Sequence, residues 1–483
     1  MEQHMYESFG LFINGRWRQA RSGRTVDVID PATEERIGSV PHAAAEDLDA
    51  ALQAASGAAK LWAATAGWER SKILRRIADD LRGRTDMAAK MMARECGKPL
   101  AEAKGEFLAA IDQFDWYADE ARRIFGHTLD GRDSGVRLNV NYRPVGPVAA
   151  FTAWNFPALL PARKIAAALA AGCPVVLKPS EETPSSAFLF AEAARTAGLS
   201  DGVLNIVTGD PAEISRHLIA SPVIRKVSLT GSVAVGKLIM RLCAEGLKRL
   251  SLELGGHAPV LIFGDADPIA VAKACAAAKF RNNGQVCISP SRFYVHASIH
   301  APFAAAMAES AKALRLGGGL DPQATCGPMI NARGRDRVES LVADAVERGA
   351  VVLSGGSRPS EFNRGYFYQP TVLDRVPDEA RIMRDEPFGP VAPITAFTHF
   401  DEVIERANAT PFGLAGYVFS NSLAIAGKAA DALDVGMVGV NDMMLAAAEI
   451  PFGGVKESGF GREGGQLGIL DYLEARYVKV RHA

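Results

Sequence analysis

Two residues in this chain have the types needed for covalent chemistry on a carbonyl group. Cys287 lies in KFRNNGQVCISP, and Glu253 lies thirty-four positions earlier in LSLELGGHAP. A cysteine thiolate can attack a carbonyl carbon, and a carboxylate can activate the water that releases the product. A free cysteine more often serves as a small buried hydrophobic residue, so other segments must decide. Four further segments bear on the choice: AWNFP (153–157), VLKPSEETP (176–184), LTGSVAVGK (229–237) and EPFGP (386–390).

The glycine-containing segment GSVAVGK (231–237) has two interpretations. It matches seven positions of a phosphate-hydrolysing loop, but Leu238 stands where that loop has Ser or Thr to hold magnesium, so phosphate hydrolysis is not expected. The better interpretation is a strand that runs into a helix starting near Ser232, whose unpaired N–H groups suit a pyrophosphate. Gly231 lets the backbone approach closely, and the Ser232 hydroxyl can donate to a phosphate oxygen. An ordinary serine-capped helix stays open as the alternative. A second segment, GFGREG (459–464), lacks a surrounding βαβ unit and is expected to be a turn.

The segment VLKPSEETP places a cation and a carboxylate three residues apart. Lys178 and Glu181 follow an expected strand, and ligands of open α/β sheets bind at the carboxyl ends of the strands. Such a pair can hold ribose hydroxyls, and Glu181 would repel a 2′-phosphate. The segment therefore favours NAD over NADP, although a solvated surface loop is an open alternative.

Composition excludes several classes of protein. The 483 residues are enough for two or more domains, and 48% of them are hydrophobic against 23% charged. A net charge of −1 predicts no nucleic-acid partner and no membrane surface. Six cysteines without C-x-x-C spacing predict no metal site and no disulfide framework, as is typical of the reducing cytoplasm. The N-terminus has no apolar stretch typical of a secretory signal, and the longest apolar run (165–177) is too short to span a bilayer.

Periodicity predicts the elements that must position these residues. Helical and strand patterns alternate over about 160–263 and again after Cys287, which predicts two α/β units with doubly wound parallel sheets. Residues 43–120 have the pattern of amphipathic helices. Residues 127–144 resemble a hairpin arm with Asp-Gly as its turn, and the tail ARYVKVR resembles a strand without a partner. Because unpaired strand edges tend to be covered, we expect arm and tail to cover each other across a subunit boundary.

Seven motifs occur in order over nearly the whole chain: AWNFP, LKPSEETP, GSVAVG, LELGG, NNGQVC, EPFGP and PFGGVKESGFGRE. Together they resemble the aldehyde dehydrogenase superfamily. The segments NFPALLPARK, KFRNNGQVC and PFGGVKESGFGRE are most similar to its NAD(P)-dependent succinate-semialdehyde dehydrogenase branch.

The resemblance implies two Rossmann-like domains, a small β oligomerisation arm and a homodimer or homotetramer. The implied ranges are an NAD-binding domain (1–126 and 145–252), a catalytic domain (253–434), an arm with tail (127–144 and 467–483), and a return to the NAD-binding domain with a loop along the substrate (435–466).

The resemblance also implies roles for individual residues. Cys287 matches the nucleophile, Glu253 the general base, and Asn155 the side-chain amide of the oxyanion hole, which the backbone N–H of Cys287 completes. The residues that match contacts to NAD are Trp154, Lys178, Ser180, Glu181, Gly231, Ser232, Gly236, Glu386 and Phe388. The implied reaction is NAD-dependent oxidation of an aldehyde to a carboxylate through a thiohemiacetal and a thioester on cysteine.

The substrate implied by this branch is an ω-carboxy semialdehyde such as succinate semialdehyde. Arg163 and Arg281 match two arginines that bind its distal carboxylate, for which a guanidinium is well shaped. The chain departs from the branch at 446–448, where alanines replace a segment containing a helping serine, so a longer, partly hydrophobic semialdehyde or a broader range also fits.

Three alternatives remain open from the sequence. A CoA-acylating dehydrogenase would use the same cysteine, and a non-redox cysteine hydrolase would need a histidine, for which His257 is the nearest candidate. A catalytically silent relative is disfavoured because every catalytic position is filled.

Overall fold

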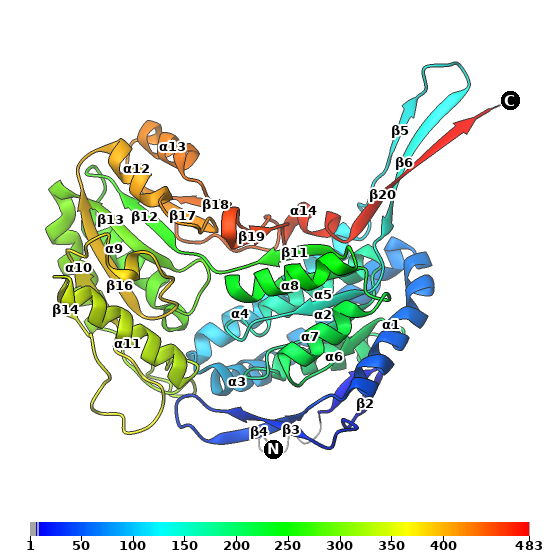
Figure 1. The fold of residues 1–483 in the computed structure, drawn as a ribbon, viewed down its shortest axis with the longest axis horizontal. Helices are drawn as coiled ribbons and strands as arrows, with labels where there is room; N and C mark the ends of the chain where they lie inside the picture. The colour runs from blue at the N-terminus through cyan, green and yellow to red at the C-terminus, as the bar shows by residue number, and fades with distance from the viewer. Residues whose placement is uncertain (1–5, 7–8, 483) are drawn as a thin grey trace.

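The computed structural model describes residue 6 and residues 9–482, which form two sheet-centred lobes and a projecting arm (Figure 1). The N-terminal start, on which the expectation of no secretory signal rests, lies largely outside the described residues. The first sheet has eight strands in the order β19-β11-β10-β7-β8-β9-β1-β2. Its strands are β1 (Leu11–Ile13), β2 (Arg16–Arg18), β7 (Val148–Phe151), β8 (Val175–Lys178), β9 (Leu204–Ile206), β10 (Lys226–Thr230), β11 (Arg249–Glu253) and β19 (Gly459–Phe460). The five central strands pair in parallel, whereas β1, β2 and β19 are antiparallel additions at the edges.

Helices cover both faces of this sheet, as a doubly wound fold requires. The helices of this lobe are α1 (Ala45–Ala64), α2 (Gly67–Arg82), α3 (Thr85–Cys96), α4 (Leu100–Glu120), α5 (Leu159–Ala171), α6 (Ser185–Thr196), α7 (Pro211–Ala220), α8 (Val233–Glu245) and α14 (Gly465–Leu470). Alternate residues of β7 lie in different cores: Val148 and Ala150 pack with α2 to α6, whereas Ala149 and Phe151 pack with α1, α7 and α8. The expected alternation over 160–263 is thereby confirmed.

The second sheet has seven strands in the order β14-β15-β16-β13-β12-β17-β18. They are β12 (Ala258–Ile262), β13 (Pro290–His296), β14 (Val351–Ser354), β15 (Thr371–Asp374), β16 (Val391–Phe397), β17 (Ala415–Phe419) and β18 (Met437–Val440). The helices α9 (Pro268–Phe280), α10 (His300–Lys312), α11 (Ala332–Glu347), α12 (Phe400–Asn408) and α13 (Leu423–Ala432) belong to this lobe. Because β18 pairs with β17, the chain returns to the first sheet only at β19, later than residue 435.

The arm is a three-stranded sheet of β5 (His127–Asp130), β6 (Val136–Pro144) and β20 (Leu473–Arg481). The tail strand β20 pairs antiparallel with β6 of the same chain, from Leu473 opposite Pro144 to Arg481 opposite Val136. Arm and tail do cover each other, but within one chain, so the expectation of a subunit boundary between them is wrong. The hairpin turn also differs, because residues 131–135 form a longer loop than a two-residue Asp-Gly turn.

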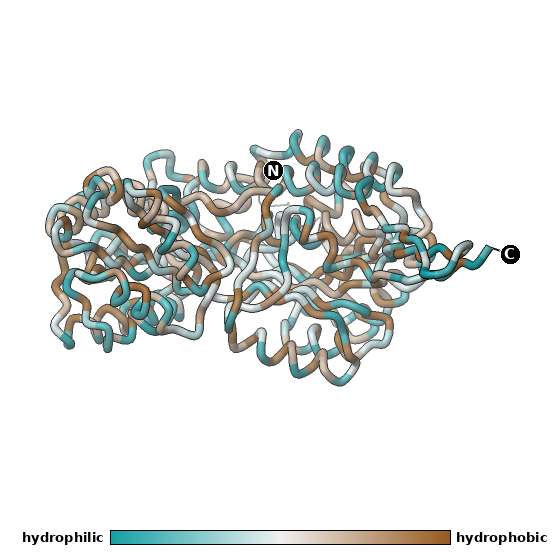
Figure 2. Tube along the Cα trace, turned by 90° about the horizontal axis from the view of Figure 1, so that it is seen from above, coloured by the Kyte–Doolittle hydropathy of each residue, from teal (hydrophilic) through white to brown (hydrophobic). Residues whose placement is uncertain are grey.

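A separate hairpin of β3 (Thr25–Ile29) and β4 (Arg36–Pro41) lies below the first lobe in Figure 1. Seen from above, hydrophobic segments concentrate inside the two lobes and hydrophilic segments along the outer helices and the arm (Figure 2). Within residues 9–482, no helix is long and apolar enough to cross a membrane. The same described residues contain no group of three or more His, Cys, Asp or Glu side chains that could hold a metal ion.

Candidate active site

Cys287 lies between two cavities, because its side chain lines both of them. The larger is a cleft of about 800 Å³ where β7, β10 and β11 end, which is the edge of a parallel sheet that binds ligands. The smaller is a pocket of about 320 Å³ bounded by α4, α5 and the segment before β13. The thiol can therefore react with a molecule in the pocket while a second molecule occupies the cleft.

The larger cleft collects eight of the residues expected at the site. They are Trp154, Asn155, Gly231, Ser232, Glu253, Cys287, Glu386 and Phe388. Trp154 and Phe388 contact each other edge to face with ring centroids 5.6 Å apart. The Glu386 carboxylate accepts a hydrogen bond of 3.1 Å from the Gly256 N–H.

The first turn of α8 opens into this cleft. Ser232 is its N-cap, since the Ser232 hydroxyl oxygen accepts the Val235 N–H at 3.3 Å. Both interpretations of this segment are therefore compatible, because the hydroxyl proton of a capping serine remains available as a donor. Residues 230–235 line the cleft, so the positive end of α8 faces it, and the cleft fits a pyrophosphate-containing dinucleotide.

Four of the expected cofactor residues do not line the cleft itself. Lys178 ends β8 and forms an ion pair with Glu181, and the Ser180 hydroxyl donates to the Glu182 carboxylate. Gly236 has a packing role, because a Cβ there would lie 2.5 Å from Leu254 Cδ1. Lys178 nevertheless lies at the same edge of the sheet as the cleft, since β8 lies beside β7 and β7 leads to Trp154.

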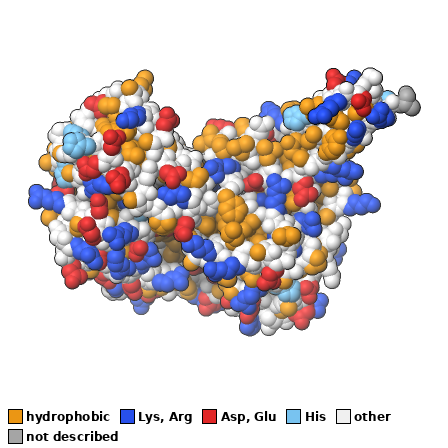
Figure 3. Space-filling model, turned by 45° about the horizontal axis from the view of Figure 1, so that its top comes forward, with side chains coloured by type: hydrophobic (Ala, Val, Ile, Leu, Met, Phe, Trp, Pro, Cys, Tyr) orange, Lys and Arg blue, Asp and Glu red, His pale blue; other side chains and the backbone are white. Residues whose placement is uncertain are grey.

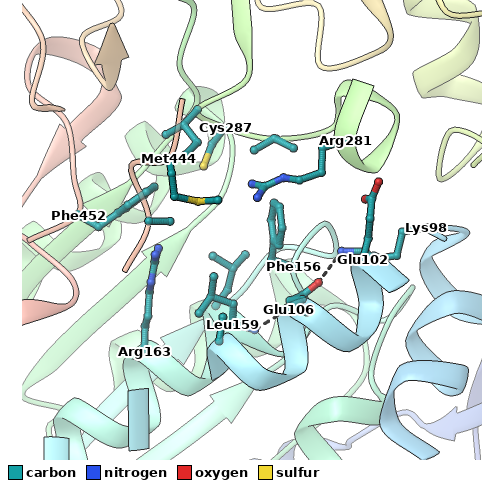
Figure 4. Close-up of a pocket in the computed structure, with 16 residues that line it drawn as sticks. Lys98, Glu102, Glu106, Phe156, Leu159, Arg163, Arg281, Cys287, Met444 and Phe452 are labelled. Atoms are coloured by element: carbon teal, nitrogen blue, oxygen red, sulfur yellow. Dashed lines mark hydrogen bonds and ion pairs between the residues drawn. The ribbon is translucent and has the colours of Figure 1, made fainter. Parts of the chain in front are cut away.

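The smaller pocket holds two arginines beside Cys287 (Figure 4). The Arg163 guanidinium lies 4.1 Å from the centroid of the Phe452 ring, and the Arg281 guanidinium lies 5.3 Å from that of Phe156. Arg163 is 3% exposed and its Nε has no hydrogen-bond acceptor. Among the described residues, no carboxylate forms an ion pair with either arginine, so both can bind an anion. Met444 and Ala446 also line this pocket and add apolar surface to its wall.

Burial and neighbouring charges control the ionisation of Glu253. Its side chain is buried, and neither carboxylate oxygen has a hydrogen-bond partner in the described structure. Burial, with a smaller contribution from the negative Glu463, raises the pKa of Glu253 to about 7, whereas Lys164 and Arg163 oppose the shift. The carboxyl is therefore poised to accept and release a proton near neutral pH.

Cys287 is held as a thiol in this environment. Burial and the nearby charge of Glu253 raise its pKa well above the ordinary value. A reacting thiol must therefore lose its proton as it attacks, and Glu253 is the neighbouring group with a pKa suited to receive it.

The side-chain amide and the backbone carbonyl of Asn155 form hydrogen bonds with different partners. Its side-chain Nδ2 donates to the Gln285 carbonyl at 3.1 Å. Its carbonyl accepts Lys98 Nζ at 2.7 Å and Asn282 Nδ2 at 3.0 Å. One amide N–H of Asn155 remains available beside Cys287, which is the donor that an oxyanion needs.

Several residues around the site were not predicted from the sequence. Lys98 and Glu106 line the smaller pocket, and the buried Lys164 and Glu463 form an ion pair near Glu253. The segment PARKIAAALAAG did contain a signal, because adjacent cations without a nearby acid in an otherwise apolar helix require partners from elsewhere.

His257 does not support the cysteine-hydrolase alternative. Its Nε2 lies 3.1 Å from the Ile382 carbonyl, and the residue lines a separate small cavity with Arg292. Burial lowers the pKa of His257 well below its ordinary value. It lines neither of the cavities that contain Cys287.

Comparison with known proteins identifies the family. The model of the aldehyde dehydrogenase family matches residues 17–478. The chain is 43% identical over 466 residues to the succinate-semialdehyde dehydrogenase [NADP(+)] of Escherichia coli K12, covering 96% of each chain. It is 43% identical over 467 residues to the glutarate-semialdehyde dehydrogenase of Pseudomonas aeruginosa, covering 97% of this chain and 96% of the relative. The solved structure of succinate-semialdehyde dehydrogenase from Burkholderia pseudomallei superposes with a TM-score of 0.96 at 43% identity, covering 98% of each chain. The chain therefore belongs to the aldehyde dehydrogenase family and is an oxidoreductase that acts on aldehydes.

Proposed function

We propose that this enzyme oxidises an aldehyde with a distal carboxylate, such as succinate semialdehyde, using NAD as the acceptor. The observation that carries this proposal is the position of Cys287 between a pocket with two guanidinium groups, neither of which pairs with a described carboxylate, and a cleft that fits a dinucleotide. A buried guanidinium is stabilised by an anion, and the substrate carboxylate can supply it. Relatives at 43% identity are named for succinate and glutarate semialdehydes.

Each residue of the site has a separate role in the reaction. Glu253 receives the proton as the Cys287 sulfur bonds to the aldehyde carbon. The Asn155 amide and the Cys287 backbone N–H stabilise the negative oxygen; one such donor typically contributes about 2.7–4 kcal/mol to lowering the barrier. When bound, NAD supplies the two-electron acceptor. After Glu253 has released that proton to solvent, its carboxylate deprotonates a water molecule, whose oxygen bonds to the acyl carbon as the Cys287 sulfur leaves and is reprotonated.

The preference for NAD is proposed from Glu181. Its carboxylate pairs with Lys178 at the end of β8, beside the strand that leads into the cleft. A ribose with free hydroxyls can hydrogen-bond to this pair, whereas a 2′-phosphate would be repelled by the carboxylate.

We also propose that the enzyme is a homo-oligomer. The arm projects away from both lobes (Figure 1), and hydrophobic side chains gather on the face between the second lobe and the arm (Figure 3). Large exposed apolar residues on α8 and α14 include Leu238, Met240, Leu467 and Leu470. A surface of this kind is typical of a protein–protein interface.

The carboxylate anchor can be tested with Arg281→Ala. Arg281 is the cleaner choice, since Arg163 also acts on the pKa values of Glu253 and Cys287. A charge-assisted contact contributes about 1.5–3 kcal/mol, so kcat/KM for succinate semialdehyde should fall by roughly 10- to 100-fold. Butanal, which lacks the carboxylate, should lose less than about threefold. An equal loss for both aldehydes would contradict an anchoring role.

The cofactor assignment can be tested with Glu181→Ser. Removing the carboxylate removes its repulsion of a 2′-phosphate, so the KM for NADP should fall and that for NAD should rise. The ratio of kcat/KM values for the two cofactors should shift toward NADP by roughly tenfold or more, equivalent to about 1.4 kcal/mol. A parent enzyme that already prefers NADP would overturn the assignment.

The pKa of Glu253 predicts the pH dependence of turnover. The carboxylate form is the active base, so kcat should rise with pH through about 7. Glu463→Gln removes a negative neighbour, which should lower the pKa of Glu253 and move the rise to lower pH. Glu457→Gln, at an exposed residue paired with Lys237, is the matched control and should leave the profile in place. A shift to higher pH in Glu463→Gln would refute the electrostatic explanation.

A further inference from the structure

A buried ion pair connects the first lobe's helices to the active site. Lys98 lies between α3 and α4, and Glu106 lies on α4, with Lys98 Nζ and Glu106 Oε2 2.5 Å apart. Their side chains are 1% and 2% exposed. Taking two charges out of water costs free energy that their attraction often does not recover, so stability alone is a weak explanation for such a pair.

The pair holds two points of the segment that follows β7. Lys98 Nζ donates to the Asn155 carbonyl at 2.7 Å. Figure 4 shows Lys98 joined to Glu106, and Lys98 Nζ lies 4.4 Å from the centroid of the Phe156 ring. Glu106 Oε1 accepts the N–H groups of Ala158 and Leu159 at 2.8 and 3.2 Å. Opposite ends of a five-residue segment are thus attached to one ion pair.

Each of these two contacts is connected to a residue that has a proposed role in the reaction. The first fixes the peptide of Asn155, whose side chain donates to the carbonyl of Gln285, two residues before Cys287. The second is the start of α5, where the first N–H groups of a helix have no partner within the helix. Glu106 supplies that acceptor from another helix, and its negative charge suits this end of the helix dipole. Arg163 lies on α5 one turn after Leu159, on the same face.

We propose that Lys98 and Glu106 are positioning residues that hold the oxyanion donor Asn155 and the anchor Arg163 in a fixed relation. An aldehyde whose carboxylate binds at Arg163 is thereby presented with its carbonyl oxygen at Asn155 and its carbon at Cys287. This inference deepens the proposed function and rests on the roles given there to Asn155 and Arg163. A charged donor matters at the Asn155 carbonyl because charge-assisted hydrogen bonds are shorter and stronger than neutral ones.

The double variant Lys98→Met/Glu106→Gln separates positioning from folding. It removes both charges, keeps similar side-chain volumes, and leaves an amide oxygen that can still accept the N–H groups of Ala158 and Leu159. Replacement of a whole buried pair is often neutral for stability, so the melting temperature should stay within a few degrees of the parent. We expect kcat to fall by roughly 10- to 100-fold for both succinate semialdehyde and butanal, since small misplacements of reacting groups cost about that much. The dissociation constant for NAD should change by less than about twofold.

A second double variant, Lys98→Met/Glu106→Ala, also removes the acceptor at the start of α5. In addition to the fall in kcat, the KM for succinate semialdehyde should rise by roughly tenfold relative to the first double variant, while the KM for butanal should not. The matched control is Lys104→Met on the same helix, which breaks an exposed ion pair with Asp86 and should behave as the parent. If the double variants do not fold, Lys98→Gln alone serves, because its neutral amide can still donate to the Glu106 carboxylate while the charged donor to the Asn155 carbonyl is lost; the same fall in kcat is expected.

Parent-like kcat in a folded variant without Lys98 would overturn the inference, as would a lower melting temperature with unchanged kinetics. A parent enzyme without any preference for the carboxylate-bearing aldehyde would instead count against the proposed substrate. The kcat of the double variants for butanal would then still test whether the ion pair positions Asn155.

Discussion

The structure depends on one constraint, which is that a single sulfur atom must face two cavities at once. Parallel strands satisfy it, because β7, β10 and β11 end at the same edge and deliver Asn155, Gly231 and Glu253 to one cleft. The second sheet then presents Cys287 against that edge, just before β13 begins. Neither lobe alone would contain both the thiol and the carboxylate, so the site exists only where the two sheets meet.

Electrostatics at this junction favour neutral groups until a reaction begins. Burial raises the pKa of both Glu253 and Glu386 to about 7 and raises that of Cys287 further. Arg163 and Arg281 in the adjoining pocket supply positive charge without forming an ion pair to these acids. An arriving anion therefore meets a cationic pocket beside an uncharged thiol, which permits binding before a thiolate forms. The separate Lys98–Glu106 pair adds no net charge, so its contribution is to geometry.

Motifs in the sequence were sufficient for the family, the doubly wound fold and the residues brought together at Cys287. Reasoning from short spacings fails where partners are distant: Lys98 and Glu106 precede Asn155 by about fifty residues, and no local pattern links them. The tail strand shows the same limit. Its alternation indicated a strand, but only the folded chain shows that β6, more than three hundred residues earlier, is its partner. Lys178 and Glu181 contact each other rather than the cleft, so their role in binding NAD remains a proposal.

The central claim is that the acyl group is carried by Cys287 and released by Glu253. The most direct measurement is intact and peptide mass spectrometry of Glu253→Gln after incubation with NAD and succinate semialdehyde. Acylation of Glu253→Gln should be slow, because the thiol has lost its base, but the adduct should persist because hydrolysis is lost as well. The account therefore predicts, after prolonged incubation, a succinyl adduct on the peptide containing Cys287, formed together with one equivalent of NADH and absent from Cys287→Ala. An adduct on another residue, or sustained turnover by Cys287→Ala, would contradict it.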